Sequence, residues 1–201
     1  MEQDWDKIAD NLLIYEHTNK SELRDWGNEN PINVYENLIG KNISSDGDRI
    51  AFICFKGEEL CKYSYDEVDS KTKQIVYLLQ GYVSAKDRIL IIGPPCAATT
   101  FTILSSSFLG CEHTVVMPSL SEEATKKISN LFQPSIIVMC NMVKERNHGK
   151  IPVIKLESEG NRLIANGRPL SHITNSRSYT CQPKDNLFSF SILSIKFLSI
   201  R

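Results

Sequence analysis

The amino-acid sequence predicts an α/β fold, with a mostly parallel sheet and helices on both of its faces. Two short apolar runs, residues 88–92 and 111–117, flank a stretch over 97–109 that is long enough for a helix of about three turns. Residues 93–95, Gly-Pro-Pro, end the first run because proline cannot donate to a sheet ladder, and Gly110 stands where the helix would end. This order is typical of a βαβ unit. Runs without polar alternation are typical of strands that helices cover on both faces.

The composition is that of an ordinary globular domain. Of the 201 residues, 41% are hydrophobic and 23% are charged, and the formal net charge is −1. This balance gives no electrostatic reason to expect nucleic acid or an anionic membrane as a partner. We find neither a secretory signal nor an apolar run near the roughly 18 residues that a membrane span needs. We therefore expect a cytoplasmic protein with no membrane span, and a mitochondrial or nuclear location stays open.

The spacing of cysteines and histidines predicts no metal site. None of the cysteines forms a C-x-x-C pair, and most lie in apolar runs, where a free thiol behaves as a small buried hydrophobe. The histidines are scattered, without the spacing of a zinc site, and His113 in an apolar run is expected to be a core residue. The cysteines are Cys54, Cys61, Cys96, Cys111, Cys140 and Cys181.

Two amphipathic helices are predicted before the first strand. Residues 4–16 place apolar side chains on one stripe, and aspartates at the start suit the positive end of a helix dipole. A second short helix is predicted over 33–41, with Val34, Leu38 and Ile39 facing inward.

A turn, a hairpin and a longer helix are predicted to follow. Residues 44–47, Ser-Ser-Asp-Gly, favour a turn, and the runs 49–55 and 60–65 are joined by a glycine-containing link typical of a hairpin. Residues 64–67, Ser-Tyr-Asp-Glu, form a capping-box pattern, which predicts the start of a helix of about four turns. Its inward face is predicted to hold Val68, Thr72, Ile75, Val76 and Leu79.

Beyond the βαβ unit over 88–117, the sequence signals for helices and strands become weaker. Ser121 is placed to cap a further helix, which is followed by predicted strands over 135–140 and 151–156. A charged loop over 141–150 joins these two strands. Residues 157–184 are polar and show no period, so we expect a surface connection there.

Seven short motifs follow one another between residues 4 and 140. They are Asp-Trp-Asp-Lys-Ile-Ala at 4–9 with Trp26, Asn-Val-Tyr-Glu-Asn at 33–37, Gly-Asp-Arg-Ile-Ala-Phe-Ile at 47–53, Ser-Tyr-Asp-Glu-Val at 64–68, Lys-Asp-Arg-Ile at 86–89, Ser-Phe-Leu-Gly-Cys-Glu-His-Thr-Val-Val at 107–116, and the helix over 121–128. In this order they resemble the amino-terminal part of the acyl-adenylate-forming (AMP-dependent synthetase/ligase) superfamily. The nearest branch is that of acetyl-CoA synthetases and propionate-CoA ligases.

The resemblance implies an incomplete amino-terminal subdomain of the adenylate-forming large domain. Residues 1–45 would form an amino-terminal helical arm, residues 46–188 part of the AMP-dependent synthetase/ligase domain, and residues 189–201 a divergent apolar tail. The complete family enzyme uses ATP, Mg and CoA to convert acetate or propionate into acyl-CoA, AMP and pyrophosphate through an acyl-adenylate. Residues 35–39 and 147–150 also resemble acetoacetyl-CoA synthetases, so the short-chain carboxylic acid substrate stays open.

The glycine-rich loop that wraps the ATP phosphates in this family has no counterpart in these 201 residues. Residues 183–188 resemble the lead-in to that loop, but the stretch that follows contains no glycine, and the last one is Gly167. Ser189, Ser191 and Ser194 are a poor substitute, because only glycine lets backbone N–H groups approach phosphate so closely. We therefore expect a truncated product without the ATP loop or the catalytic lysine, with no catalytic residue and no cofactor bound by this chain alone.

Lys144, Arg146 and Lys150 lie where acetyl-CoA synthetases carry basic residues that contact the 3′-phosphate of CoA. Cationic groups suit phosphate, so the resemblance implies a CoA-binding role in a complete enzyme, and the alternative is a solvated charged loop. Two classes of function remain. One is an acyl-CoA synthetase fragment that is inactive alone, and the other is a non-catalytic fragment that binds an intact paralogue through an exposed sheet edge.

Overall fold

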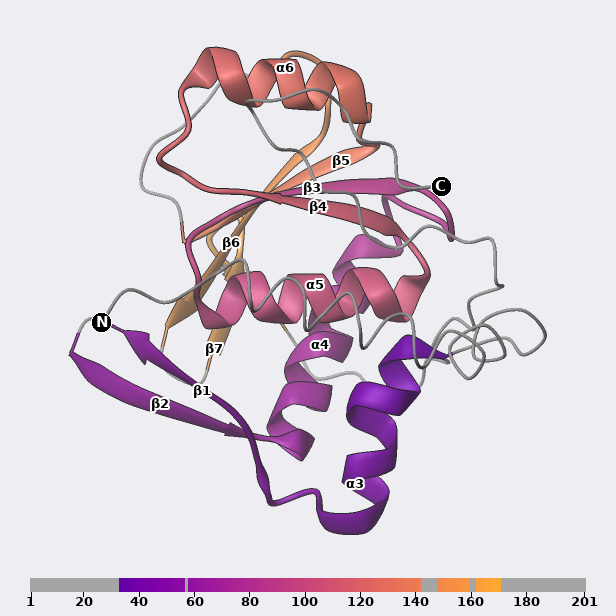
Figure 1. The fold of residues 1–201 in the computed structure, drawn as a ribbon, viewed down its shortest axis with the longest axis vertical. Coiled ribbons are helices and arrows are strands. Elements are labelled where there is room, and N and C mark those ends of the chain that lie inside the picture. The colour runs from indigo at the N-terminus through magenta and orange to yellow at the C-terminus, as the bar shows by residue number, and fades with distance from the viewer. Residues whose placement is uncertain (1–32, 57, 142–147, 160–161, 171–201) are drawn as a thin grey trace, which may run out of the picture.

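The computed structural model describes residues 33–56, 58–141, 148–159 and 162–170. The predicted helix over 4–16 and the apolar tail over 189–201 lie outside these ranges. The described residues form a six-stranded sheet with helices on both faces and a separate two-stranded sheet (Figure 1), so the predicted α/β class is confirmed. No helix of the described part is long and apolar enough to cross a membrane.

The large sheet has the strand order β4-β3-β5-β6-β7-β8. Its strands are β3 (Arg88–Ile92), β4 (Glu112–Val116), β5 (Ile136–Cys140), β6 (Val153–Glu159), β7 (Arg162–Ala165) and β8 (Arg168–Pro169). The first four strands in this order pair in parallel, whereas β7 pairs antiparallel with β6 and with β8. The sheet is therefore mostly parallel, as predicted, with an antiparallel extension on one side.

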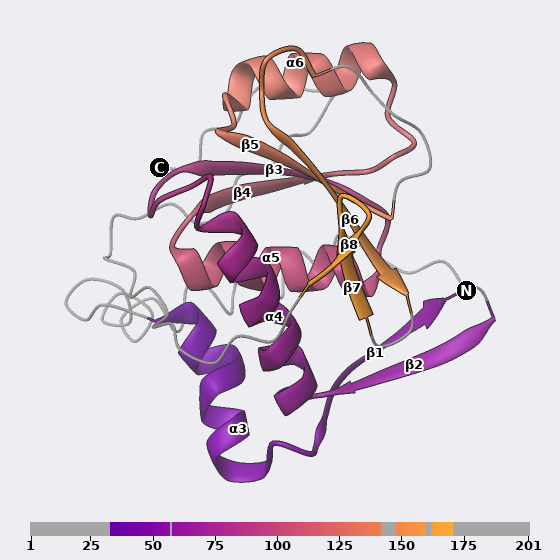
Figure 2. The ribbon, with the colours of Figure 1, turned by 180° about the vertical axis from the view of Figure 1, so that it is seen from behind.

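Two helical layers enclose the parallel strands. One layer covers one face of the sheet and a single helix covers the opposite face (Figures 1 and 2). Ile89 and Ile91 of β3 belong to the first core, and Leu90 and Ile92 belong to the second, and all four are 0% exposed. This burial on both sides explains why the strand is a continuous apolar run. The first layer is α4 (Tyr65–Leu79) with α5 (Ala97–Leu109), and the second is α6 (Glu122–Phe132).

Helix α5 begins and ends where the sequence predicts, although it buries many hydroxyl side chains. Thr102 donates to the carbonyl of Ala98 at 2.7 Å, and Ser105 donates to that of Phe101 at 2.7 Å. A buried hydroxyl needs a partner, and these bonds to the preceding turn supply it. The helix ends at Gly110, whose φ of 69° lies in the left-handed region that favours glycine.

The predicted hairpin is confirmed and forms a sheet of its own. Strand β1 (Ile50–Lys56) pairs antiparallel with β2 (Glu59–Ser64) and has no hydrogen-bonded pairing with the large sheet in the described part. Its inner face packs on α5 instead. The ring centroids of Phe52 and Tyr63 lie 5.6 and 5.3 Å from that of Phe101.

Side-chain caps begin two of the helices, as predicted. The hydroxyl of Ser64 accepts from the N–H of Glu67 at 3.3 Å, and the Glu67 carboxylate accepts from the N–H of Ser64 at 2.9 Å. The hydroxyl of Ser121 accepts from the N–H of Ala124 at 3.1 Å at the start of α6. The predicted inward positions of α4 are all buried: Val68, Thr72, Ile75, Val76 and Leu79.

The helix before β1 is longer than predicted. It consists of η1 (Glu36–Gly40), a π-helical segment, and α3 (Lys41–Asp46). The turn predicted over 44–47 is therefore wrong for residues 44–46, which are helical. Ser44 and Ser45 lie in the helix, and their hydroxyls find partners there by donating to carbonyls of the preceding turn, at 3.2 and 3.1 Å.

The inward face of this helix also differs from the prediction. Ile39 is buried as predicted and Val34 is half-buried, but Leu38 is 52% exposed. Tyr35 takes the inward place and is only 3% exposed. A π-helical turn is wider than 3.6 residues, so it shifts the period on which the prediction depended.

The surface connection predicted over 157–184 is wrong for its described residues. Strand β6 continues to Glu159, and β7 and β8 follow as antiparallel strands. Asn166 and Gly167 join β7 to β8 with φ values of 49° and 76°. Asn-Gly in a two-residue link is a strong hairpin signal, because its left-handed backbone matches the twist of the flanking strands.

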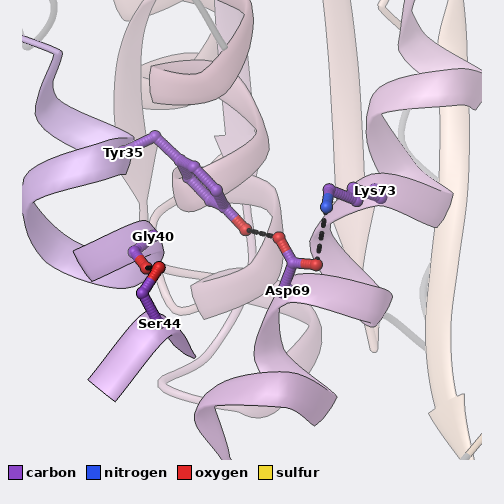
Figure 3. A network of polar contacts seen from close by, with 5 residues as sticks. All are labelled: Tyr35, Gly40, Ser44, Asp69 and Lys73. Carbon is purple, nitrogen blue, oxygen red and sulfur yellow. Dashed lines mark hydrogen bonds and ion pairs between the residues drawn. The ribbon is translucent and has the colours of Figure 1, made fainter. Parts of the chain in front are cut away.

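A polar network ties the first helix to α4 (Figure 3). The hydroxyl of Tyr35 donates to Asp69 Oδ1 at 3.0 Å, and Lys73 Nζ lies 2.7 Å from Asp69 Oδ2. Burial, together with the charge of Asp69, raises the pKa of Tyr35, so the hydroxyl keeps its proton and remains a donor. The Tyr35 ring packs edge-on against Phe108 of α5, with centroids 4.8 Å apart. One side chain therefore joins three helices.

His113 of β4 is buried, as the sequence predicts. It is 4% exposed, and burial lowers its pKa from 6.5 to about 4, against a hydrogen bond with the Cys111 backbone that acts in the opposite direction. The imidazole is therefore neutral at pH 7, and this environment suits a core residue rather than a general acid.

Replacing Tyr35 by Phe is expected to lower the free energy of unfolding by about 1–2 kcal/mol, because the hydroxyl bond to a charged carboxylate is lost. Urea unfolding followed by circular dichroism measures the loss. Tyr77→Phe on α4 is the matched control, since Tyr77 is 62% exposed, and it should change the unfolding free energy little. Equal effects in the two variants would contradict the role given to the network.

Acidification from pH 7 to pH 5 is expected to cost about 2 kcal/mol of stability through His113 alone. The folded pKa is depressed, so the unfolded state binds more protons throughout the window between 6.5 and about 4, and stability falls as the pH falls. Urea unfolding of wild type and of His113→Gln at several pH values measures this term. The variant should show a shallower pH dependence, and identical slopes would refute the assignment.

Candidate functional site

The carboxyl ends of β3, β4 and β5 meet at one edge of the large sheet, because the three strands run parallel. From β3 the chain passes through α5 to β4 on one side, and from β4 through α6 to β5 on the other. These helices lie on opposite faces, so the connections diverge at the end of β3 (Figure 1). In open α/β sheets, ligands bind in the crevice at such a point. We call residues 93–96, 117–121 and 141 the carboxyl edge.

Gly93 lets the end of β3 approach both β5 and α5. Its N–H donates to the carbonyl of Val116 at 3.1 Å. A Cβ atom on Gly93 would lie 2.5 Å from Thr99 Oγ1 and 2.8 Å from Cys140 Cβ, so a larger residue would force a shift. Thr99 Oγ1 donates to the carbonyl of Pro94 at 2.7 Å. The loop after β3 is thus fixed on the first turn of α5.

The first turn of α5 also contacts the hairpin. Cys96 is the N-cap residue without a side-chain cap bond, and its Sγ lies 3.4 Å from Thr99 Oγ1. Burial raises the pKa of Cys54 on β1, and the Cys96 thiol and the Ala97 backbone act on it as smaller causes, so Cys54 lies close to this turn. The hairpin β1–β2 therefore reaches the carboxyl edge of the large sheet.

Asn141 directly follows β5 and is not among the site residues predicted from the sequence. Its φ is 46°, a left-handed conformation that asparagine tolerates better than most residues. Its Oδ1 accepts from the N–H of Ser158 at 2.9 Å, and its Nδ2 donates to Ser158 Oγ at 3.2 Å. An asparagine directly after an apolar strand is the signal that could have pointed to it.

Of the three basic residues predicted to contact CoA, one lies within the described residues. Lys144 and Arg146 lie outside the described residues, whereas Lys150 is exposed. Lys150 is two residues before Pro152, whose carbonyl accepts from the N–H of Ile137 near the start of β5 at 2.9 Å. Lys150 therefore lies toward the amino ends of the strands, on the side opposite the carboxyl edge. A CoA-binding role for these residues stays a prediction.

The five cysteines of the described residues fall into two groups, and Cys181 lies outside those residues. Cys111 and Cys140 are buried, and burial raises the pKa of each to about 12, so both stay protonated at neutral pH. Cys54, Cys61 and Cys96 are free and only half-buried, so they are less enclosed than predicted. Within the described ranges, no group of three or more His, Cys, Asp or Glu side chains could hold a metal ion.

The side chains of the carboxyl edge hold the edge together. Its residues are Gly-Pro-Pro-Cys at 93–96, Met-Pro-Ser-Leu-Ser at 117–121 and Asn141, and among these only the thiol is titratable. The Ser121 hydroxyl and the Asn141 amide have partners within the fold. These residues can shape and orient loops around a ligand, and they offer no carboxylate or imidazole for acid–base catalysis.

Comparison with curated proteins identifies relatives among acyl-CoA synthetases. No protein-family model matches the chain. The acetyl-coenzyme A synthetase of Helicobacter acinonychis is 25% identical over 138 residues, which cover 67% of this chain and 20% of the relative. The chain thus spans about a fifth of the length of this curated relative.

Solved structures share the fold at low sequence identity. The crystal structure of IdnL1 has a TM-score of 0.62 at 16% identity and covers 80% of this chain and 32% of its own. A fatty acyl-adenylate ligase from L. pneumophila, solved with acyl adenylate and pyrophosphate, has a TM-score of 0.54 at 19% identity and covers 61% and 23%. The sequence relatives support the predicted resemblance to the acyl-adenylate-forming superfamily, and the solved structures share the fold of this chain.

Proposed function

We propose that residues 1–201 supply part of the scaffold of an ATP-dependent short-chain acyl-CoA synthetase and do not complete the reaction alone. The observation that carries the proposal is the match to an acetyl-coenzyme A synthetase over 67% of this chain but only 20% of the relative. The carboxyl edge supports it, because its residues orient loops and bring no acid–base group. No phosphate loop rich in glycine occurs in the sequence.

The proposed overall reaction joins a short-chain carboxylic acid to CoA in two steps. The carboxylate first attacks ATP, forming an acyl-adenylate and releasing pyrophosphate, and the CoA thiol then displaces AMP. ATP, Mg and CoA would be bound by a complete enzyme. Acetate or propionate is the proposed acid, which the acetyl-coenzyme A synthetase relatives support, and acetoacetate is the alternative.

Lys144, Arg146 and Lys150 are proposed to contact the 3′-phosphate of CoA in that enzyme. Their charges suit a phosphate dianion, and the exposure of Lys150 leaves its ammonium group open to a ligand.

The second candidate is a non-catalytic chain that binds an intact paralogue. It is favoured by the outer face of the hairpin, where Ile53, Phe55 and Leu60 are 53%, 69% and 48% exposed. Strand β4 is also at an edge of the large sheet in the described part, and edge strands can pair with another chain.

Purified residues 1–201 are expected to show no acetate-dependent exchange of labelled pyrophosphate into ATP. The exchange reports acyl-adenylate formation and does not require CoA, so it tests the first step alone. A full-length acetyl-coenzyme A synthetase is the positive control. Exchange that depends on acetate and scales with the amount of chain would overturn the proposed inactivity.

The two candidate functions are separated by mixing the chain with the full-length synthetase before size-exclusion chromatography. Only the second candidate, binding to an intact paralogue, requires the two proteins to co-elute.

The CoA contact is tested by placing residues 141–150 into the corresponding segment of an active acetyl-coenzyme A synthetase. KM for CoA is expected to be at least about tenfold lower than for 3′-dephospho-CoA, because charge-assisted bonds to the phosphate are worth roughly 1.5–3 kcal/mol. Lys144→Ala, Arg146→Ala and Lys150→Ala together should reduce this ratio. Unchanged acetate-dependent pyrophosphate exchange confirms that each chimera is folded. A ratio that the three substitutions leave intact would exclude the contact.

A further inference from the structure

Three half-buried cysteines gather where the hairpin β1–β2 meets the start of α5. Cys54 is on β1, Cys61 is on β2, and Cys96 caps α5. All three pack against the first core and all are free. Burial raises the pKa of Cys54, and the thiols of Cys61 and Cys96 raise it further, so the three side chains lie close together. Such a cluster was not expected from the sequence, because the spacing between its members follows no motif.

Cys54 and Cys61 are direct cross-strand neighbours. The antiparallel register pairs Phe52 with Tyr63, Ile53 with Lys62, and Cys54 with Cys61. Directly opposed side chains point to the same face, with Cβ atoms about 4.5–5.5 Å apart. The Phe52–Tyr63 pair, one step away on the same face, shows that such pairs touch here, since its stacked rings are 5.0 Å apart.

The geometry of a disulfide is within reach of this pair. A disulfide needs Cβ atoms about 3.5–4.5 Å apart, so closing it requires the opposed strands to approach by roughly an ångström. The hairpin can adjust in this way, because in the described part its ladder is separate from that of the large sheet. Cys96 does not belong to the hairpin ladder, and its thiol contacts Thr99 on its own helix.

The Cys54 and Cys61 thiols are more accessible to solvent than the buried thiols of Cys111 and Cys140. Cys111 and Cys140 are 0% exposed, whereas Cys54 and Cys61 are half-buried and can meet a small reagent. Burial and the neighbouring thiols raise the pKa of Cys54, so it is a protonated thiol at rest. In a reducing compartment the pair would remain reduced and would be oxidised only when the thiol pool shifts.

We propose that Cys54 and Cys61 form a dithiol modification site that a low-molecular-weight disulfide oxidises to an intramolecular disulfide. One of the two thiolates attacks the small disulfide and releases one small thiol. The second thiolate attacks the resulting mixed disulfide, forms the Cys54–Cys61 bond and releases the second small thiol. The protein loses two electrons and two protons, and the small disulfide gains them as two thiols.

The test uses the 201-residue chain and oxidised glutathione. After treatment, remaining thiols are alkylated, the monomer is isolated on a non-reducing gel, and it is digested with trypsin. Trypsin cuts after Lys56 and Lys62, so Cys54 is in peptide 50–56 and Cys61 in peptide 57–62. These two peptides are expected to appear as one disulfide-linked species that replaces most of free peptide 50–56 and disappears on reduction.

Cys96→Ser is the matched control, because it removes the third thiol of the cluster and should leave the yield of the linked species within twofold of wild type. Cys61→Ser should abolish it and leave Cys54 at most as a glutathione adduct, with far-UV circular dichroism confirming the fold. A link between peptide 50–56 and peptide 89–126, which contains Cys96, would overturn the proposal. So would glutathione adducts without a link, or unmodified peptides.

Discussion

The fold depends on the burial of β3 from both sides. Its side chains alternate between two cores, so a helix layer must cover each face of the sheet to bury the strand from solvent. The backbone groups of β3 must be paired as well, and β4 and β5 pair with them on either side. These two demands fix the order of elements around the strand. They explain why α5 and α6 lie on opposite faces and why the central unit is the most enclosed part of the described chain.

The packing around β3 also constrains the residues of the carboxyl edge. Where the connections diverge, the close approach of β3, β5 and α5 leaves no space for a side chain on Gly93. Asn141 fixes the exit from β5 by bonding to β6. These contacts hold the ends of β3 and β5 in place, and loops on a fixed scaffold often carry binding residues. The proposed scaffold role accords with this arrangement.

The sequence predicts those elements whose signals are local and strong. The bounds of β3 and α5 agree with the prediction because proline, glycine and continuous apolar runs mark them. The inward face near Tyr35 was assigned wrongly because a π-helical segment changes the helical period, which a 3.6-residue pattern cannot detect. The β7–β8 hairpin was missed although Asn166-Gly167 signals it, since strands of four and two residues are too short to show an alternating pattern. At the site, the basic residues after β5 come from the resemblance alone, and their role stays a prediction.

The position of β3 in the middle of its sheet has a consequence for how the chain is made. Ile89 pairs with His113 on one side and Ile136 on the other, and both partners are synthesised later than β3 itself. Domains fold during translation from the amino-terminal end, so this apolar central strand leaves the ribosome before either neighbour exists. Parallel pairing of this kind is slow, because distant segments must meet first. Until β5 emerges, the backbone groups on one side of β3 lack their native partner strand.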